Sequence, residues 1–190
     1  MIRWLPLFLI ILANFVPFAL PGDNLEVTEL KGGSVMTDFP AASEMVQPPL
    51  KWFVINDPSS PIRLESAGII VKQHHSDYSY ASRGIATSSS GITEMEVEFI
   101  LFDVRGANMK TLFRTEKVEL GPGRSFLLDN LGPWKATVDE VQEYGASVSF
   151  VTRVRKSNGG EWVTDAKAMA REVQALKPKL AHKGTATSLP

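Results

Sequence analysis

Residues Ile92–Asp103, with the sequence ITEMEVEFILFD, contain the clearest alternation of apolar and charged side chains in the 190-residue chain. In an extended strand successive side chains point to opposite faces, so two sets separate. The apolar set is Met95, Val97, Phe99 and Leu101, and the acidic set is Glu94, Glu96 and Glu98. A shift of one residue would turn three carboxylates toward the core, so the pattern predicts a half-buried strand in a firmly set register.

Short apolar runs separated by turn residues continue on both sides of this strand. The expected strands are Leu50–Asn56, Ile62–Gln73, Tyr78–Thr87, Met109–Leu120, Ser125–Leu128, Trp134–Glu143, Ala146–Lys156 and Glu161–Thr164. The turn Ser157–Gly160 is the strongest hairpin signal, because Asn-Gly tolerates the positive φ of a tight turn. In the strand before it, Val148, Phe150, Thr152 and Val154 are expected to share one face.

Many short strands with no helical pattern between them predict an all-β fold in residues 50–164. About 7–9 antiparallel strands with turn signals every 8–12 residues or so are typical of a β-sandwich. A small β-barrel is the alternative, and a βαβ fold is disfavoured.

The hydrophobic period changes to that of a helix after this domain. Asp165 can cap an amphipathic helix over residues 165–178, which Pro178 is expected to end, and residues 179–190 are predicted to be a disordered tail. The expected apolar side of this helix is Ala166, Met169, Ala170, Val173 and Leu176. Eight basic and three acidic residues lie between Arg153 and Pro190. The helix is therefore expected to contact anionic envelope material or an acidic partner, or to pack on its own more acidic sandwich.

The N-terminal residues 1–22, MIRWLPLFLIILANFVPFALPG, have one positive charge followed by an apolar run, as in a secretory signal peptide. An uncleaved N-terminal anchor is the alternative, and it would be the chain's sole contact with a membrane. Residues 23–49 contain Gly32-Gly33 and Pro48-Pro49 and are predicted to be a flexible spacer or a loosely docked arm. Export without cysteine or a glycosylation sequon favours a bacterial envelope, periplasmic or extracellular.

Composition excludes several classes of function. The chain has no cysteine, which removes disulfide scaffolds, thiol nucleophiles and iron–sulfur sites. A formal net charge of −1 argues against nucleic acid as a partner. No phosphate-binding loop, dinucleotide fingerprint, H-E-x-x-H string or serine-hydrolase elbow occurs. We therefore predict no cofactor and assign no catalytic residue.

The string Phe99-Ile100-Leu101-Phe102-Asp103, followed by Gly106 and later by Gly121-Pro122-Gly123 and Phe126, resembles the FxLYD family. These are immunoglobulin-like domains of exported bacterial and archaeal proteins. Phe102 stands at the family's tyrosine position, so any contact of that hydroxyl is missing. The resemblance covers about a quarter of the chain and implies an immunoglobulin-like sandwich in an exported protein. It implies no catalytic residues, and the motif is explained by core packing and by an aspartate that opens a turn.

Three groups of residues are candidate sites. His74 and His75, with Asp77 nearby, are weak candidates for a zinc or copper site, although adjacent strand residues point to opposite faces. Glu94, Glu96 and Glu98 stand about 7 Å apart along a strand and could bind a cation or a basic partner, act as an acid/base pair, or pair with Arg114 or Lys117 of the next strand. The third group, Trp52, Trp134 and Trp162, could form a sugar-stacking surface or belong to the core.

The sequence thus predicts a non-catalytic, exported immunoglobulin-like module that binds another envelope protein or a cell-surface component. The alternatives are an accessory envelope hydrolase that uses carboxylates on or beside the Glu94–Glu98 strand, and a weak metal-binding protein that uses His74 or His75.

Overall fold

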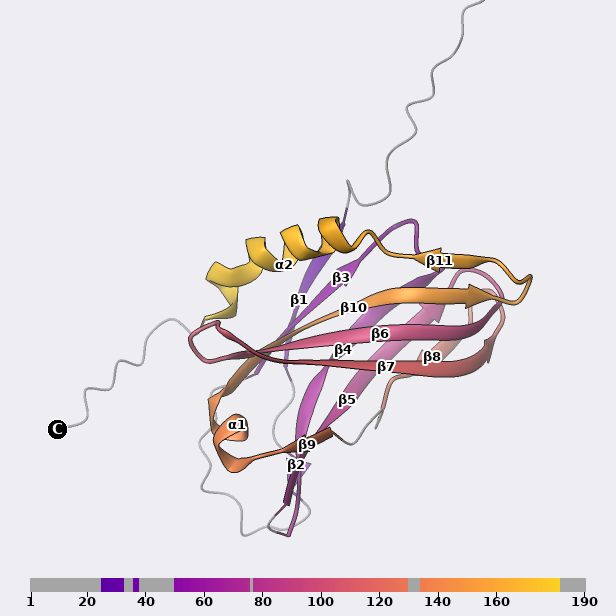
Figure 1. Cartoon of the computed structure of the whole chain (residues 1–190). Coiled ribbons are helices and arrows are strands. Elements are labelled where there is room, and N and C mark those ends of the chain that lie inside the picture. The colour runs from indigo at the N-terminus through magenta and orange to yellow at the C-terminus, as the bar shows by residue number, and fades with distance from the viewer. Residues whose placement is uncertain (1–24, 33–35, 38–49, 76, 130–133, 182–190) are drawn as a thin grey trace, which may run out of the picture.

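A computed structural model describes residues 25–32, 36–37, 50–75, 77–129 and 134–181. Two β-sheets pack face to face, and a C-terminal helix lies along the outer side of one of them (Figure 1). The predicted all-β sandwich with one C-terminal amphipathic helix is confirmed. The predicted signal segment 1–22 and the tail from residue 182 lie outside the described residues. No helix in the described part of the chain is long and apolar enough to span a membrane.

The two sheets contain all the described strands. Sheet A has the order β1-β3-β10-β6-β7 with β11 paired to β10, and its strands are β1 (Glu26–Lys31), β3 (Lys51–Asn56), β6 (Ile92–Asp103), β7 (Asn108–Leu120), β10 (Tyr144–Lys156) and β11 (Glu161–Val163). Sheet B has the order β2-β4-β5-β8 with β9 paired to β5, and its strands are β2 (Met36–Thr37), β4 (Ile62–His74), β5 (Asp77–Ser88), β8 (Ser125–Leu127) and β9 (Trp134–Ala136). The helices are α1 (Val138–Glu143) and α2 (Ala166–Leu180).

The strand count and pairing differ from the expectation. Eleven strands are described instead of about 7–9, and the two without an expected counterpart, β1 and β2, come from residues 23–49. Two of the pairings, β3 with β10 and β2 with β4, are parallel instead of antiparallel. Strands β3 and β10 are neighbours in sheet A and run in the same direction.

The predicted register of β6 is correct, and it separates two apolar layers. Met95, Val97, Phe99 and Leu101 are buried between the sheets, where they join residues of β4 and β5. A second cluster lies on the opposite side of sheet A, where Phe53, Phe102, Val148 and Phe150 meet α2. Sheet A is therefore covered on both faces where α2 crosses it.

One edge of β4 is paired by side chains of sheet A instead of by a strand. Its neighbour β2 pairs only with Lys72 and Gln73, so none of the described strands lies on that side of the backbone from Leu64 to Ile69. Five side chains bond to it: Asn56 to the N–H and carbonyl of Leu64, Ser149 to the carbonyl of Ala67, Ser147 to the N–H of Ile69, and Trp52 and Tyr144 to the carbonyl of Ile69. Buried backbone groups need partners, and here the opposite sheet supplies them.

The predicted strand Trp134–Glu143 is wrong beyond Ala136. Thr137 caps helix α1, since its hydroxyl accepts the N–H of Glu140 while the Glu140 carboxylate accepts the N–H of Thr137. This reciprocal capping box is readable in the sequence as Thr-x-x-Glu, and it overrides the weak strand pattern.

The predicted common face of β10 is wrong at Val154. Val148 and Phe150 face α2, but Val154 is buried between the sheets. The cause is a β-bulge between Val151 and Arg153 opposite β6, because one extra residue reverses the faces of the side chains that follow it.

Two segment boundaries also differ from the prediction. The predicted flexible spacer 23–49 contributes β1 and β2; β1 pairs with β3 and its Glu26 carboxylate lies 2.6 Å from Arg63. Helix α2 does not end at Pro178 but continues to Leu180. Leu180 is buried in the cluster beneath α2, and the Lys51 ammonium donates to the carbonyls of Lys179 and Ala181 at 3.0 and 2.9 Å, which stabilises the last turn.

Candidate functional site

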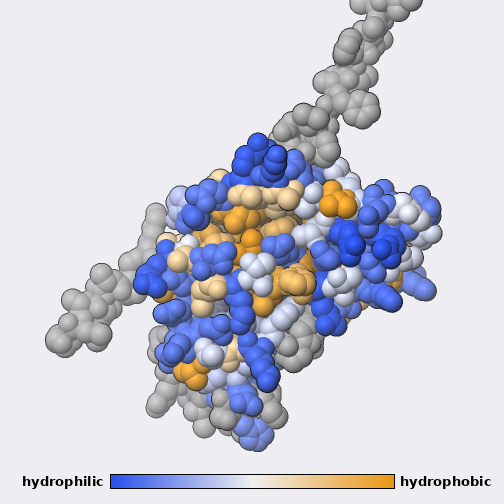
Figure 2. Space-filling view, in the orientation of Figure 1, coloured by the Kyte–Doolittle hydropathy of each residue, from blue (hydrophilic) through white to orange (hydrophobic). Residues whose placement is uncertain are grey.

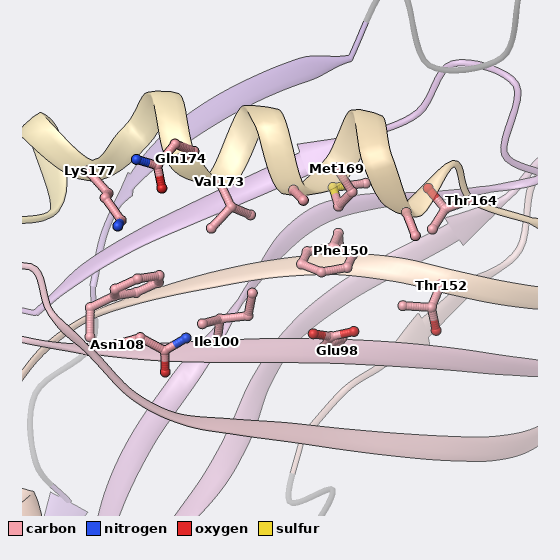
Figure 3. A pocket seen from close by; sticks show the side chains of 13 residues that line it. Glu98, Ile100, Asn108, Phe150, Thr152, Thr164, Met169, Val173, Gln174 and Lys177 are labelled. Atoms are coloured by element: carbon pink, nitrogen blue, oxygen red, sulfur yellow. The ribbon is translucent and has the colours of Figure 1, made fainter.

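A groove of about 410 Å³ runs between α2 and the outer face of sheet A. Figure 3 shows it from close by, with the helix on one side and strands β10 and β6 below. In the space-filling view an apolar band lies directly under the hydrophilic outer side of the helix (Figure 2). A volume of this size is in the ordinary range for ligand sites, which are mostly apolar with a few placed polar groups.

The apolar lining comes from one helix and two strands. Met169 and Val173, one turn apart on α2, form the helical side, and Ile100 of β6 and Phe150 of β10 form the floor. Asp165 begins the helix by accepting the N–H groups of Lys167 and Ala168 at 2.8 and 3.2 Å, as its predicted role as N-cap requires. The apolar stripe of α2 is therefore only partly used for packing, and its remainder faces the groove.

Glu98 is the acidic residue of the groove. It lies on the same face of β6 as Ile100, and it is only partly exposed. Its carboxylate makes no hydrogen bond or ion pair with the described residues. Desolvation, and next the nearby carboxylate of Glu96, raise the pKa of Glu98 above its usual range. A half-buried carboxylate without a cation is costly to the free protein and is a natural contact for a positively charged group.

The other two glutamates of the strand are already engaged. Arg153 of β10 lies 3.7 Å from Glu94 and 3.4 Å from Glu96, and Arg155 lies 3.8 Å from Glu94. Glu96 also accepts the Thr152 hydroxyl at 2.8 Å. These pairs run to β10, not to the predicted Arg114 or Lys117 of β7. The bulge in β10 offers the reason, since it places the side chain of Arg153 on the face that carries the glutamates.

Basic and amide groups line the groove away from Glu98. Lys177 and Gln174 of α2 and Asn108 of β7 lie there, and Figure 3 shows them toward the opposite end from Glu98 and Thr152. The groove therefore has a carboxylate near one end, an ammonium near the other, and apolar side chains between. This arrangement suits an elongated ligand with an apolar middle and a cationic group placed at Glu98.

The residues that carried the FxLYD resemblance are structural. Phe99 and Leu101 are buried between the sheets, and Phe102 is buried beneath α2. Asp103 accepts the backbone N–H groups of Arg105 and Ala107 at 2.9 and 2.7 Å and an Arg105 guanidinium N–H at 3.0 Å. It opens the β6–β7 turn, as expected, and Gly106 adopts a φ of 83° in it. The resemblance itself stays a prediction.

The described side chains of the remaining candidates do not assemble into a site. His74 ends β4 and His75 occupies the turn with a φ of 55°; the described residues hold no group of three or more histidine, aspartate or glutamate side chains that could bind a metal. His182 lies outside the described residues. The tryptophans share no surface: Trp52 is buried against Ile70, Trp134 packs near Phe99 with ring centroids 6.1 Å apart, and Trp162 donates to Ser59.

Sequence reasoning did not find the groove. It identified Glu98 and the stripe of α2 separately, but not that the helix returns over the outer face of β6. The available signal was the second apolar set on β10 and β3, since Phe53, Val148 and Phe150 lie on the face opposite the inter-sheet core. A strand that is apolar on both faces indicates that a further element covers it.

The comparisons with known proteins give no family. No protein-family model, no curated protein and no solved structure matches the chain.

Proposed function

We propose that this chain is a non-catalytic binding module of an exported protein, and that the groove between α2 and sheet A is its ligand site. The occupant is an apolar segment of another protein that carries one lysine or arginine. The proposal depends on the carboxylate of Glu98, which has no ion-pair partner among the described residues and lies beside the apolar part of the lining. A cation placed there would form a partly desolvated, charge-assisted pair, which is stronger than a hydrogen bond between neutral groups.

A peptide segment fits the lining better than a small metabolite. The groove is open along its length, and its polar groups lie apart instead of converging on one point. Phe113 of β7, which pairs with Glu98 in the strand register, is 69% exposed and extends the apolar surface beyond the groove. An extended or helical segment could cover both surfaces at once.

The test is photo-crosslinking from positions on α2 in the producing cell. A photoreactive residue at Gln174, which lines the groove, is expected to give a discrete crosslinked protein. The matched control position is Arg171, which is exposed on the same helix and does not line the groove. The crosslink at Gln174 should weaken with Glu98→Lys, and the crosslinked segment should be apolar with a basic residue.

Equal products from Gln174 and Arg171 would contradict the proposal, as would a crosslinked segment that is acidic or wholly polar. Retention of the crosslink in Glu98→Lys would remove the role of the carboxylate. Residue 98 is only partly buried, so Glu98→Lys is expected to fold, and its urea unfolding curve checks this.

A hydrolase is the second candidate, and the raised pKa of Glu98 favours it. General acids have pKa values raised by desolvation, and Glu96 beside it is held by Arg153 and Thr152. Turnover of chromogenic glycosides or esters that disappears in Glu98→Gln would support this function. Absence of turnover with wild-type protein that shows the groove crosslink supports the binding module.

A further inference from the structure

Strand β7 is the outermost strand of sheet A, and none of the described strands pairs with its free edge. It is 13 residues long, and Figure 1 shows it along the margin of the sandwich, beside β6. A long unpaired edge exposes N–H and carbonyl groups that can pair with another strand. Its edge is therefore a second candidate interaction surface, separate from the lining of the groove.

The accessible part of this edge has defined limits. At its start the Lys110 ammonium contacts the Glu140 carboxylate at 3.0 Å and the carbonyl of Lys135 at 3.2 Å, so α1 and β9 lie against this end. The strand ends at Leu120, followed by a turn. Residues 111–119 remain, with the sequence TLFRTEKVE, and Thr115 is their midpoint.

This nine-residue segment is complementary to itself when run antiparallel about Thr115. Arg114 then lies opposite Glu116 of the other copy, Leu112 opposite Val118, Phe113 opposite Lys117, and Thr115 opposite its own copy. Opposite charges, apolar pairs and threonine pairs are the cross-strand contacts that stabilise sheets. An ammonium beside an aromatic ring adds a cation–π contact.

We propose that the partner of this edge is a second copy of the chain, joined by antiparallel β7–β7 pairing centred on Thr115. The two-fold axis is perpendicular to the sheet, which makes the interface isologous and continues sheet A across both copies. The two Arg114–Glu116 pairs, one within each free strand at 2.5 Å, exchange for two pairs between the strands.

The neighbouring registers are unfavourable. Paired residues must keep their faces, so the centre moves in steps of one residue, and each step changes which charges meet. Centring on Arg114 places two guanidinium groups opposite each other and sets Leu112 against Glu116. Centring on Glu116 places two carboxylates opposite each other, and like charges in this position are destabilising.

The pairing also keeps the buried side chains of both copies on one face of the combined sheet and the exposed ones on the other. Leu112 and Val118 are buried in the inter-sheet core, and their pairing would bring the two cores next to each other at the junction. Phe113, 69% exposed in one copy, faces outward with the groove and would be covered in part by the stem of Lys117. The dimer therefore places two grooves on one continuous face; it covers part of Phe113, which lies beyond the lining of the groove.

Charge exchange tests the register with the full chain. In analytical ultracentrifugation, wild-type protein should show a concentration-dependent monomer–dimer equilibrium. Arg114→Glu sets two carboxylate pairs across the junction and Glu116→Arg sets two guanidinium pairs, so each variant alone should dimerise at least about tenfold more weakly. An equal mixture of the two variants should regain the dimer, because every cross-strand pair is then opposite in charge. Arg171→Glu on α2 is the matched control and should leave the equilibrium unchanged.

A second measurement reads the centre of the pairing directly. The chain has no cysteine, so Thr115→Cys introduces one thiol per copy at the two-fold axis, where cross-strand Cα atoms are close enough for a disulfide. Mild oxidation should crosslink it, whereas Thr111→Cys, about 27 Å from its counterpart by the strand rise, should stay uncrosslinked.

Three results would overturn the proposal: a monomer at every concentration of wild-type protein, single variants that dimerise as well as wild type, or a mixture that does not regain the dimer. Equal crosslinking of both cysteine variants would reject the register. Urea unfolding of each variant separates loss of pairing from loss of folding.

Discussion

Two buried tyrosines allow the side-chain bonds to the edge of β4 to be tested with one chemical change. Tyr144 and Tyr80 are both fully buried and pack edge to face, with ring centroids 5.6 Å apart. The Tyr144 hydroxyl donates to the carbonyl of Ile69 at 2.9 Å, whereas the Tyr80 hydroxyl has no hydrogen-bond partner among the described residues. Replacing either with phenylalanine removes one oxygen and keeps the ring.

The two substitutions should differ in their effect on the free energy of unfolding. Tyr144→Phe loses one buried hydrogen bond, and the Ile69 carbonyl keeps the Trp52 indole N–H at 3.2 Å, so the loss is about 0.5–1.5 kcal/mol. Tyr80→Phe removes a buried polar group without a partner, so stability should be unchanged or rise by about 1 kcal/mol. The cation–π contact of Lys110 with ring 80 is retained.

Urea unfolding followed by tryptophan fluorescence measures both variants against wild type, with equal slopes required for the comparison. If Tyr80→Phe destabilises the protein as much as Tyr144→Phe, the loss comes from ring packing and the reasoning about the β4 edge is wrong. If Tyr144→Phe costs nothing, the Trp52 bond alone satisfies that carbonyl.

Three further predictions concern other parts of the fold. Gly68→Ala should lower the free energy of unfolding by about 1–3 kcal/mol, because an added Cβ overlaps the buried ring of Trp52; Gly121→Ala, which has space, is the control in the same urea assay. Asp103→Ala should cost about 1.5–3 kcal/mol at neutral pH. Burial would raise the pKa of Asp103, but the hydrogen bonds from Ala107 and Arg105 outweigh it and lower the pKa. The stability that Asp103 contributes is therefore fully present above the ordinary aspartate pKa and is lost as pH falls through the lowered pKa. A difference in unfolding free energy between wild type and Asp103→Ala that stays constant through this acid range would contradict the prediction. Lys51→Met should increase hydrogen exchange in the last turn of α2, since the ammonium there bonds two carbonyls, while Lys167→Met at the other end should not.

The sequence predicted those features that depend on local alternation or on turn chemistry. The faces of β6, the Asn-Gly hairpin between β10 and β11, and Asp165 as a cap all follow from neighbouring residues. The errors have two causes. The strand expected through Glu143 is wrong because the capping box of Thr137 and Glu140 starts a helix there, and the face expected for Val154 is wrong because no local sequence signal indicates the bulge before it.

Long-range placement explains what could not be predicted about the site. Helix α2 is held over sheet A because Leu176 and Leu180 pack against apolar residues of β3 and β10. Whether Glu98 is exposed or half-buried depends on this position of the helix. Edge strand β1 could not be predicted from the sequence either, because nearly all its side chains are exposed and it pairs with β3 through backbone hydrogen bonds.

The bonds from Asn56, Ser147 and Ser149 to the backbone of β4 determine how the two sheets can move relative to each other. Apolar contacts are non-directional and would allow one sheet to slide slightly over the other. Hydrogen bonds to Leu64, Ala67 and Ile69 occupy fixed intervals along one strand, so a slide of one residue would break all of them together. Because no sulfur atom takes part in them, this alignment of the sheets is independent of the redox potential of the surroundings.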